Sequence, residues 1–325
     1  MLQVAVDGHY EFNGSARQAQ RKTGETIMAR IAFIGLGNMG GPMSVNLVKA
    51  GHQVRGYDIV PDKIARAAAG GVEVATSNPN AAKDADFVFT MLPTGKEVRE
   101  VLVDDDEVMD VVGPDTIIVD SSTTDLDATD YIHTAAAKRG LALIDSPVSG
   151  GMAGAEAGTL TFMAGGAPDA IDTAEPVFLA MGKKMVRAGG PSAGQAVKVC
   201  NNMLLGISMV GACEAIALGE AAGVDHQVLF DVISTSTGNC WAMNVNCPMP
   251  DMVETAPANR GYTPGFTAKL MLKDLTLSQA AAAKTGAVTP LGEHARALYE
   301  AFCDERDGEV DFSAMVHMMR EMQRG

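Results

Sequence analysis

Residues 30–58 read RIAFIGLGNMGGPMSVNLVKAGHQVRGYD, and this stretch determines the fold class. A short apolar strand, Arg30 to Ile34, leads directly into a G-x-G-x-x-G turn. A helix is expected over Pro42–Ala50, followed by a second strand over His52–Tyr57 and then an acid, Asp58. A glycine pattern alone is a weak signal, but these elements in this order are typical of a dinucleotide-binding βαβ unit. The turn itself consists of Gly35, Leu36, Gly37, Asn38, Met39 and Gly40.

The three glycines of the turn have different physical roles in such a unit. Gly35 permits the tight turn, Gly37 lets a pyrophosphate approach the backbone, and Gly40 lets helix and strand pack closely. The N-terminus of the following helix then faces the phosphates. Asp58 would accept hydrogen bonds from the adenosine ribose and repel a 2′-phosphate, which predicts NAD rather than NADP. The alternative is a βαβ unit whose glycine-rich turn binds nothing.

Further short apolar strands alternate with helical segments after this unit. They are expected over Asp86–Met91, Thr116–Val119 and Leu141–Ile144, with Leu160–Ala164 and Lys184–Val186 as further candidates. Such alternation predicts a parallel, doubly wound sheet, and ligands of these sheets bind beyond the carboxyl ends of the strands. The loops that follow the strands therefore open on one edge. They contain Leu92 and Pro93, Ser122 and Thr123, and Gly150 and Gly151.

Strand signals end after Gly190, and the rest of the chain is helical in pattern. The run Met203–Ala222 has Glu214 and Glu220 as its only charges, which predicts a long helix buried on most sides. The two acids and the recurring glycines argue against a membrane span. Further helices are expected over Val228–Ile233, Phe266–Thr285, Ala287–Asp304 and Phe312–Met322, with a long irregular loop over Asn239–Gly265.

The predicted fold is α/β: an N-terminal Rossmann sheet followed by an all-α domain, joined by the long buried helix. The predicted domains are residues 1–27 as a disordered extension, 28–192 as the NAD-binding domain and 193–325 as a helical substrate and dimerisation domain. The extension has no apolar segment of the kind found in signal peptides, and its acidic residues disfavour a mitochondrial transit segment. Met28 is a candidate for the natural start.

Composition excludes several classes of function. The 325 residues carry a net charge of −15, without the clusters of Lys and Arg that nucleic-acid binding requires. The five cysteines are widely spaced and the six histidines are scattered, which predicts reduced thiols and no metal site. We therefore expect a cytoplasmic protein, with the mitochondrial matrix as the alternative if the extension is a transit segment. The expected partners exclude nucleic acid and membranes.

Lys198 and Asn202 lie four residues apart near the start of the long apolar segment, so they project from one face of a helix. A buried lysine beside a cation has a lowered pKa, and oxidised nicotinamide is such a cation. Lys198 would then take the proton of an alcohol as its hydride leaves, with Asn202 holding the amine or the reacting oxygen. The alternative is that Lys198 extends to solvent from the first turns of the helix.

Six short motifs in order resemble the β-hydroxyacid dehydrogenase family and cover nearly all of the chain beyond the extension. They are GLGNMG at Gly35–Gly40, MLPT at Met91–Thr94, DSST at Asp120–Thr123, SPVSGG at Ser146–Gly151, GQAVKVCNNMLL at Gly194–Leu205 and KLMLKDL at Lys269–Leu275. The loop around Trp241 is most similar to family members that oxidise 3-hydroxyisobutyrate. It departs from them at Cys247, where an asparagine is usual.

The resemblance implies a role for each matching residue. Lys198 is the catalytic lysine and Asn202 assists it, whereas Ser122 and the Gly150–Gly151 turn bind substrate. Leu92, Pro93, Thr123 and Lys273 contact the cofactor together with the glycine turn and Asp58. Trp241 and Phe266 would supply the wall of a small apolar pocket. Taken singly, Ser122 is also explained as a helix cap, Lys273 and Asp274 as a surface ion pair, and Trp241 as a core anchor.

The expected activity is NAD-dependent oxidation of 3-hydroxyisobutyrate, a small anionic hydroxy acid, to methylmalonate semialdehyde in valine degradation. Reduction of tartronate semialdehyde or another small semialdehyde is the alternative within the family. A nucleotide-sensing protein that has lost catalysis is the alternative outside it. Family members are commonly dimers or tetramers, so a homodimer or homotetramer is expected.

Overall fold

The computed structural model describes residues 28–105 and 108–323 of the chain, so the predictions for residues 1–27 lie outside it. The described residues form two compact units. Unit 1 comprises residues 28–122, Asp127–Gly150 and Gly154–Gly194; unit 2 comprises Thr123–Leu126, Gly151–Ala153 and residues 195–323. The predicted domain limits stay a prediction. They divide the chain at single positions, whereas unit 2 also includes two short segments from the N-terminal half of the chain.

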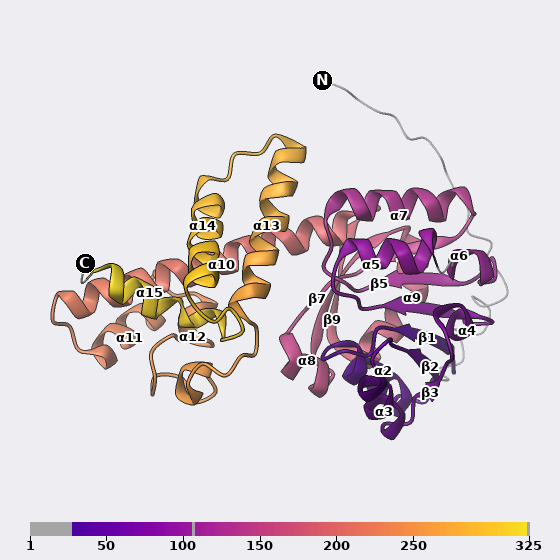
Figure 1. Cartoon of the computed structure of the whole chain (residues 1–325), viewed down its shortest axis with the longest axis horizontal. Coiled ribbons are helices and arrows are strands. Elements are labelled where there is room, and N and C mark those ends of the chain that lie inside the picture. Colours follow the sequence, from indigo (N-terminus) through magenta and orange to yellow (C-terminus); the bar gives the residue numbers. More distant parts are fainter. Residues whose placement is uncertain (1–27, 106–107, 324–325) are drawn as a thin grey trace. The chain divides into compact units, whose positions relative to one another are not determined.

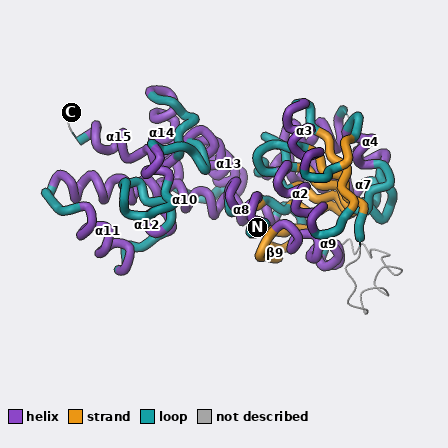
Figure 2. Tube along the Cα trace, turned by 90° about the horizontal axis from the view of Figure 1, so that it is seen from below, coloured by secondary structure: helices purple, strands orange, loops and turns teal. Residues whose placement is uncertain are grey.

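Unit 1 is built on one twisted sheet, whose strands are drawn in orange in Figure 2. Along the sheet the order is β3-β2-β1-β4-β5-β6-β8-β7, and β9 pairs with β8. From β1 the chain adds β2 and β3 on one side and then β4, β5 and β6 on the other side, as in a doubly wound sheet. The bounds are β1 Arg30–Ile34, β2 Gln53–Tyr57, β3 Glu73–Val74, β4 Phe87–Thr90, β5 Ile117–Asp120, β6 Ala142–Asp145, β7 Val148–Ser149, β8 Leu160–Gly166 and β9 Gly182–Gly189.

Pairing is parallel from β3 through β6, which confirms the predicted fold class. The expectation of a parallel sheet is wrong at β8, which runs antiparallel to both β6 and β7. Only Ser146 and Pro147 separate β6 from β7. Because β8 is antiparallel to both, β6 and β7 run in the same direction, and the chain reverses only after β7, across residues 150–159. This connection is shorter than the roughly dozen or more residues that a parallel crossover needs.

Helices cover both faces of this sheet, as Figure 1 shows. Alternate residues of β1 enter different cores: Ile31 and Phe33 pack with α2 and α9, whereas Ala32 and Ile34 pack with α4 to α7. Strands buried on both faces are near-continuous apolar runs, which explains the pattern of β1. The helices are α2 Gly40–Lys49, α3 Pro61–Ala69, α4 Asn78–Ala82, α5 Gly95–Arg99, α6 Val108–Val111, α7 Leu126–Lys138, α8 Gly151–Ala157 and α9 Pro168–Met181, with a π-helical turn at Glu100–Asp104.

Unit 2 consists of helices packed around the long helix α10 (Figure 1). Its core includes Met209, Ile216, Met271 and the fully buried Tyr299, whose hydroxyl donates to the carbonyl of Phe312 over 2.9 Å. The bounds are α10 Ala193–Ala221, α11 His226–Thr235, α12 Trp241–Asn244, α13 Ala268–Thr285, α14 Pro290–Glu305 and α15 Met315–Met322, with 3-10 turns at Pro257–Arg260 and Phe312–Ala314.

Helix α10 begins at Ala193, ten residues before the predicted Met203, so Lys198 and Asn202 both lie inside it. The expectation that it is buried on most sides is wrong, because Leu204 and Leu218 are 63% and 67% exposed. Its most apolar stretch is long enough to cross a membrane by length and composition, yet 50% of that stretch is buried in the protein. The core helices of soluble proteins can be equally long and apolar, so the length and composition of α10 are weak evidence for a membrane span.

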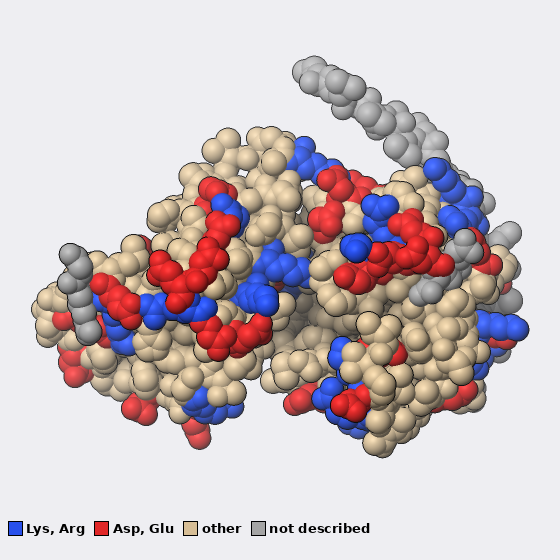
Figure 3. Space-filling view, viewed as in Figure 1, with Lys and Arg blue, Asp and Glu red and all other residues tan. Residues whose placement is uncertain are grey.

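Acidic groups form the larger clusters on the face shown in Figure 3, interspersed with Lys and Arg. This distribution agrees with the net charge of −15.

Candidate active site

The glycine turn lies in unit 1 between β1 and α2, and its backbone explains two of its three glycines. Gly35 has φ +91°, and a Cβ there would lie 2.3 Å from the carbonyl oxygen of Met91. A Cβ on Gly40 would lie 1.9 Å from the carbonyl oxygen of Gly35. Neither position has room for a side chain, so both glycines are required by the fold of the chain itself.

Gly37 is different, and this difference supports a bound dinucleotide. Among the described residues, the one heavy atom found near a Cβ built there is Nζ of Lys63, at 3.9 Å. Packing of the protein therefore leaves this position open, as expected where a phosphate approaches the backbone. Within the described chain, α2 also has neither a side-chain cap nor an acid in its first turn, so its N-terminus suits an anion. The residues present fit NAD.

Asp58 is buried at the end of β2 and holds the glycine turn in place. One carboxylate oxygen accepts the amide of Leu36 at 2.8 Å, and the other accepts the amide of Val60 at 2.9 Å. The carboxylate thus links the turn to the start of α3, a structural task that its place in the sequence motif does not reveal. Its contact with the adenosine ribose stays a prediction.

The loops after β4 and β5 are joined by Ser122 and Asp120. Ser122 Oγ accepts the amide of Leu92 at 2.9 Å. Asp120 Oδ1 accepts both the hydroxyl of Thr90 at 2.8 Å and the amide of Ser122 at 3.1 Å. The helix-cap explanation of Ser122 is therefore wrong: its hydroxyl binds the neighbouring loop. The contacts of Ser122, Leu92 and Pro93 with ligands stay predictions.

Asp120 is fully buried beside Asp145, its partner in the register of β5 and β6. Burial is the main cause that raises the pKa of Asp120 to about 6, and the nearby carboxylate of Asp145 adds to it. Asp145 in turn accepts from the imidazole of His133 at 2.8 Å and the amide of Ser192 at 2.9 Å. The sequence motif marked Asp120 but not its unusual titration, since that depends on a neighbouring strand.

We expect Asp120→Asn to flatten the dependence of stability on pH. Between pH 3.8 and about 6 the unfolded carboxyl loses its proton while the native one keeps it, so rising pH destabilises the wild type. The loss is about 3 kcal/mol across this window, at 1.36 kcal/mol for each pH unit. The asparagine of the variant does not titrate, so urea unfolding from pH 4 to 7 should show a smaller decline. Parallel curves for wild type and variant would contradict the assignment, and the exposed Asp115→Asn is the control.

Gly150 precedes α8 and Gly151 is its first residue; both are exposed, with φ of +137° and +61°. Only glycine adopts both conformations readily, which explains the pair. Their proposed role in binding a substrate carboxylate stays a prediction.

Lys198 lies in unit 2 on α10 and is 7% exposed, so the alternative of an amine extended to solvent is wrong. Asn202, one turn later, is 3% exposed, and its amide donates to Asp274 of α13 at 2.5 Å. The side-chain amide of Asn201 donates to Asn202 at 2.8 Å. These contacts orient Asn202 with its amide nitrogen on the acid, on the same face of α10 as Lys198.

Burial lowers the pKa of Lys198, and the neighbouring Lys273 lowers it further, whereas Asp274 opposes both. Burial likewise raises the pKa of Asp274, against the effect of the two lysines. Desolvation is therefore the main cause of the pKa shift of both Lys198 and Asp274. An amine in this position gives up its proton more readily than a lysine in water, as a general base must.

Lys273 donates to the backbone carbonyl of Thr123 at 2.9 Å, and both residues belong to unit 2. The structure thus brings together two residues that were predicted as cofactor contacts from distant motifs. Whether either contacts the cofactor stays a prediction.

Asp274 is the residue that our sequence analysis missed, because we considered it only as half of a surface ion pair. It is 5% exposed, so that interpretation is wrong. A signal was present: Met271, Asp274, Leu275 and Ser278 form the i, i+3, i+4, i+7 stripe of a buried helix face. A carboxylate on such a stripe needs a buried partner, and here it has Lys198 and Asn202.

Trp241 belongs to the region that was predicted as an irregular loop, whereas Phe266 was predicted as the first residue of the next helix and lies two residues before α13. Trp241 is the first residue of α12 and is 51% exposed, so it does not anchor the core. Phe266 is half-buried and packs edge-on against Phe312, with ring centroids 5.7 Å apart. Their role as a pocket wall stays a prediction. Within the described residues, no group of three or more His, Cys, Asp or Glu side chains could hold a metal ion.

Each of the two units matches a family of known proteins. Residues 30–190 match the NAD-binding domain of 6-phosphogluconate dehydrogenase, and residues 192–319 match the NAD-binding region of NADP-dependent 3-hydroxyisobutyrate dehydrogenase. A probable 3-hydroxyisobutyrate dehydrogenase of Mycobacterium bovis is 48% identical over 90% of this chain and 98% of its own length. An NAD-dependent L-serine dehydrogenase of Pseudomonas aeruginosa is 45% identical over 91% and 99%.

A solved structure of 3-hydroxyisobutyrate dehydrogenase from Mycobacterium tuberculosis with L-serine has a TM-score of 0.87 and 47% identity, covering 90% of this chain and 100% of the other. With the glycine turn and the buried amine, these matches define an NAD-dependent oxidoreductase of hydroxy acids. The predicted cofactor is confirmed. The chain belongs to the 3-hydroxyisobutyrate dehydrogenase family, as its motifs predicted.

Proposed function

We propose that the chain oxidises 3-hydroxyisobutyrate to methylmalonate semialdehyde, with Lys198 as the general acid and base. The observation that carries this proposal is the buried Lys198, with a lowered pKa, beside Asp274 and Asn202. The glycine turn would hold NAD, which would supply the acceptor for the hydride of the alcohol carbon. The neutral amine of Lys198 takes the hydroxyl proton, so the carbon–oxygen bond becomes a carbonyl. In reduction the ammonium returns the proton.

In this proposal Asp274 stabilises the ammonium that forms as the alcohol loses its proton. The reaction also needs a hydrogen-bond donor near the reacting oxygen and a binding contact for the substrate carboxylate. Asn202 is held by its hydrogen bond to Asp274 and acts on the reacting groups through that acid. The amides of Gly150 and Gly151, together with Ser122, bind the carboxylate, and Trp241 and Phe266 enclose the methyl group.

L-serine is the second candidate substrate, because one relative is named as its dehydrogenase and the similar solved structure carries it. Serine has an ammonium where 3-hydroxyisobutyrate has a methyl group, so an apolar wall favours the latter. We expect kcat/KM for 3-hydroxyisobutyrate to exceed that for L-serine by about tenfold or more. Following reduced nicotinamide with both acids, and with tartronate semialdehyde in reverse, tests this. A preference for L-serine or for the semialdehyde would reassign the substrate.

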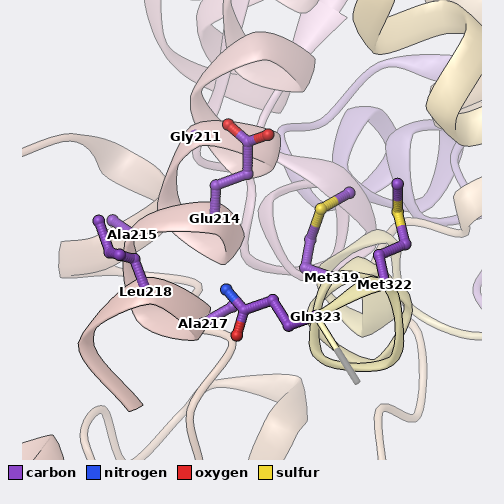
Figure 4. Close-up of a pocket in the computed structure, with 8 residues that line it drawn as sticks. All are labelled: Gly211, Glu214, Ala215, Ala217, Leu218, Met319, Met322 and Gln323. Carbon is purple, nitrogen blue, oxygen red and sulfur yellow. The ribbon is translucent and has the colours of Figure 1, made fainter. Parts of the chain in front are cut away.

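We also propose that the chain is a homodimer or homotetramer. Helix α11 has no buried residue within the described protein, although Val228 and Val232 are apolar and 55% and 56% exposed. Between α10 and α15 lies a groove of about 460 Å³ whose lining residues are shown in Figure 4; exposed Leu218 and Met322 border it. Exposed apolar surface of this kind favours self-association. Sedimentation analysis tests the proposal, and a monomer at all concentrations would contradict it.

For localisation we propose the cytoplasm, supported by five free cysteines in the described chain. The mitochondrial matrix is the alternative, and valine degradation is the pathway that the proposed substrate implies. Nucleic acid and membrane are not among the proposed partners.

A further inference from the structure

The sequence does not indicate where Lys63 lies in the fold. It is the third residue of α3, and its ammonium lies 3.7 Å from Oδ1 of Asp58. The same nitrogen lies 3.9 Å from the Cβ that Gly37 lacks. The side chain is 34% exposed, so its charge is only partly screened by water. One cation thus adjoins both the glycine at which a phosphate approaches and the acid expected at the ribose.

The surroundings of Asp58 limit how strongly it can repel an additional phosphate. Its two oxygens already accept the amides of Leu36 and Val60. The ammonium of Lys63 adds a full positive charge next to one of these oxygens. Asp58 and Lys63 together are neutral, and two amide dipoles point at the carboxylate. A phosphate on the adenosine 2′-oxygen would therefore meet a cation as well as the acid.

We propose that Lys63 is a specificity-determining residue for the cofactor: it attracts the dinucleotide phosphates and weakens the rejection of NADP by Asp58. A lysine suits this task because its ammonium is a compact charge on a flexible stem, which reaches a phosphate without bidentate geometry. The inference rests on NAD binding at the glycine turn and is independent of the hydroxy-acid substrate.

The test measures binding of NADH and NADPH to the full chain by fluorescence, without substrate. Lys63→Met should raise the Kd for NADPH by about tenfold, the scale of one charge-assisted contact, and that for NADH by only about threefold. The ratio of the two affinities therefore changes by about threefold in favour of NADH. Lys63→Arg keeps the charge and should stay near wild type. The difference between Lys63→Met and wild type should shrink at high salt.

The matched control is Lys138→Met, an exposed lysine in the last turn of α7. Helix α7 ends before the start of β6, so Lys138 lies at the edge of the sheet opposite the glycine turn. Two results would overturn the proposal: Kd values in Lys63→Met equal to those in Lys138→Met, or equal losses for NADH and NADPH. Circular dichroism of each variant establishes that it is folded. Because no turnover is measured, a wrong substrate assignment cannot produce either result.

Discussion

Lys198→Met should lower kcat/KM for the hydroxy acid by about 100- to 10,000-fold, the usual range for loss of a positioned general base. Methionine preserves much of the apolar stem of lysine, so the buried site is not left with a cavity. The residues expected at the cofactor phosphates lie in unit 1, whereas Lys198 lies in unit 2. NADH affinity should therefore remain near wild type. Steady-state kinetics and NADH fluorescence give the two readouts.

The control for this variant is Lys269→Met, because Lys269 lies in the same unit and its side chain is 72% exposed. It should keep wild-type turnover. If Lys198→Met retained turnover, Lys198 would not be the general base. If the wild type turned over no hydroxy acid while binding NADH, the nucleotide-sensing alternative would replace catalysis.

Asp274→Asn separates a chemical role of the acid from a structural one. Asp274 raises the pKa of Lys198 against the effect of burial, so removing its charge lowers that pKa further. Oxidation needs the neutral amine, and the alkaline rise of kcat/KM should move to lower pH in the variant. A lower rate with an unchanged pH profile would mean that Asp274 supports the fold but does not influence the amine.

Gly40→Ala should lower stability, whereas Gly37→Ala should leave stability nearly unchanged and weaken cofactor binding. The Cβ added by Gly40→Ala would lie 1.9 Å from a backbone oxygen, so the turn or α2 must shift. We expect a loss of about 3 kcal/mol or more in the free energy of unfolding. At position 37 the nearest atom found is the end of a flexible lysine at 3.9 Å, so stability should change by less than about 0.5 kcal/mol.

The methyl group added by Gly37→Ala should instead occupy the space through which a phosphate approaches the backbone, weakening NADH binding by about tenfold or more. Urea unfolding and NADH titration of the two variants make the test. Normal NADH affinity in Gly37→Ala would show that the dinucleotide does not use this face. A fully stable Gly40→Ala would show that the close packing of β1 and α2 is not required.

Much of unit 1 follows from the sequence because its signals are local. Residues 30–58 contain their own strand, turn, helix and acid, and the structure has β1 at the predicted Arg30–Ile34. The positive φ of Gly35 is also a local requirement. By contrast, the reversal of direction at β8 was not predicted, since a short apolar strand has the same pattern in a parallel and an antiparallel pair.

The sequence by itself determined the dinucleotide fold, the family and the spacing that places Lys198 and Asn202 on one face of a helix. Only the tertiary structure decided what surrounds that face. Asp274 lies 72 positions from Asn202 and Lys273 lies 150 from Thr123, and each contact exists because separate segments pack together. Turn geometry and helical period are properties of neighbouring residues, whereas burial, and with it the pKa of a lysine, depends on residues that the chain brings in from far away.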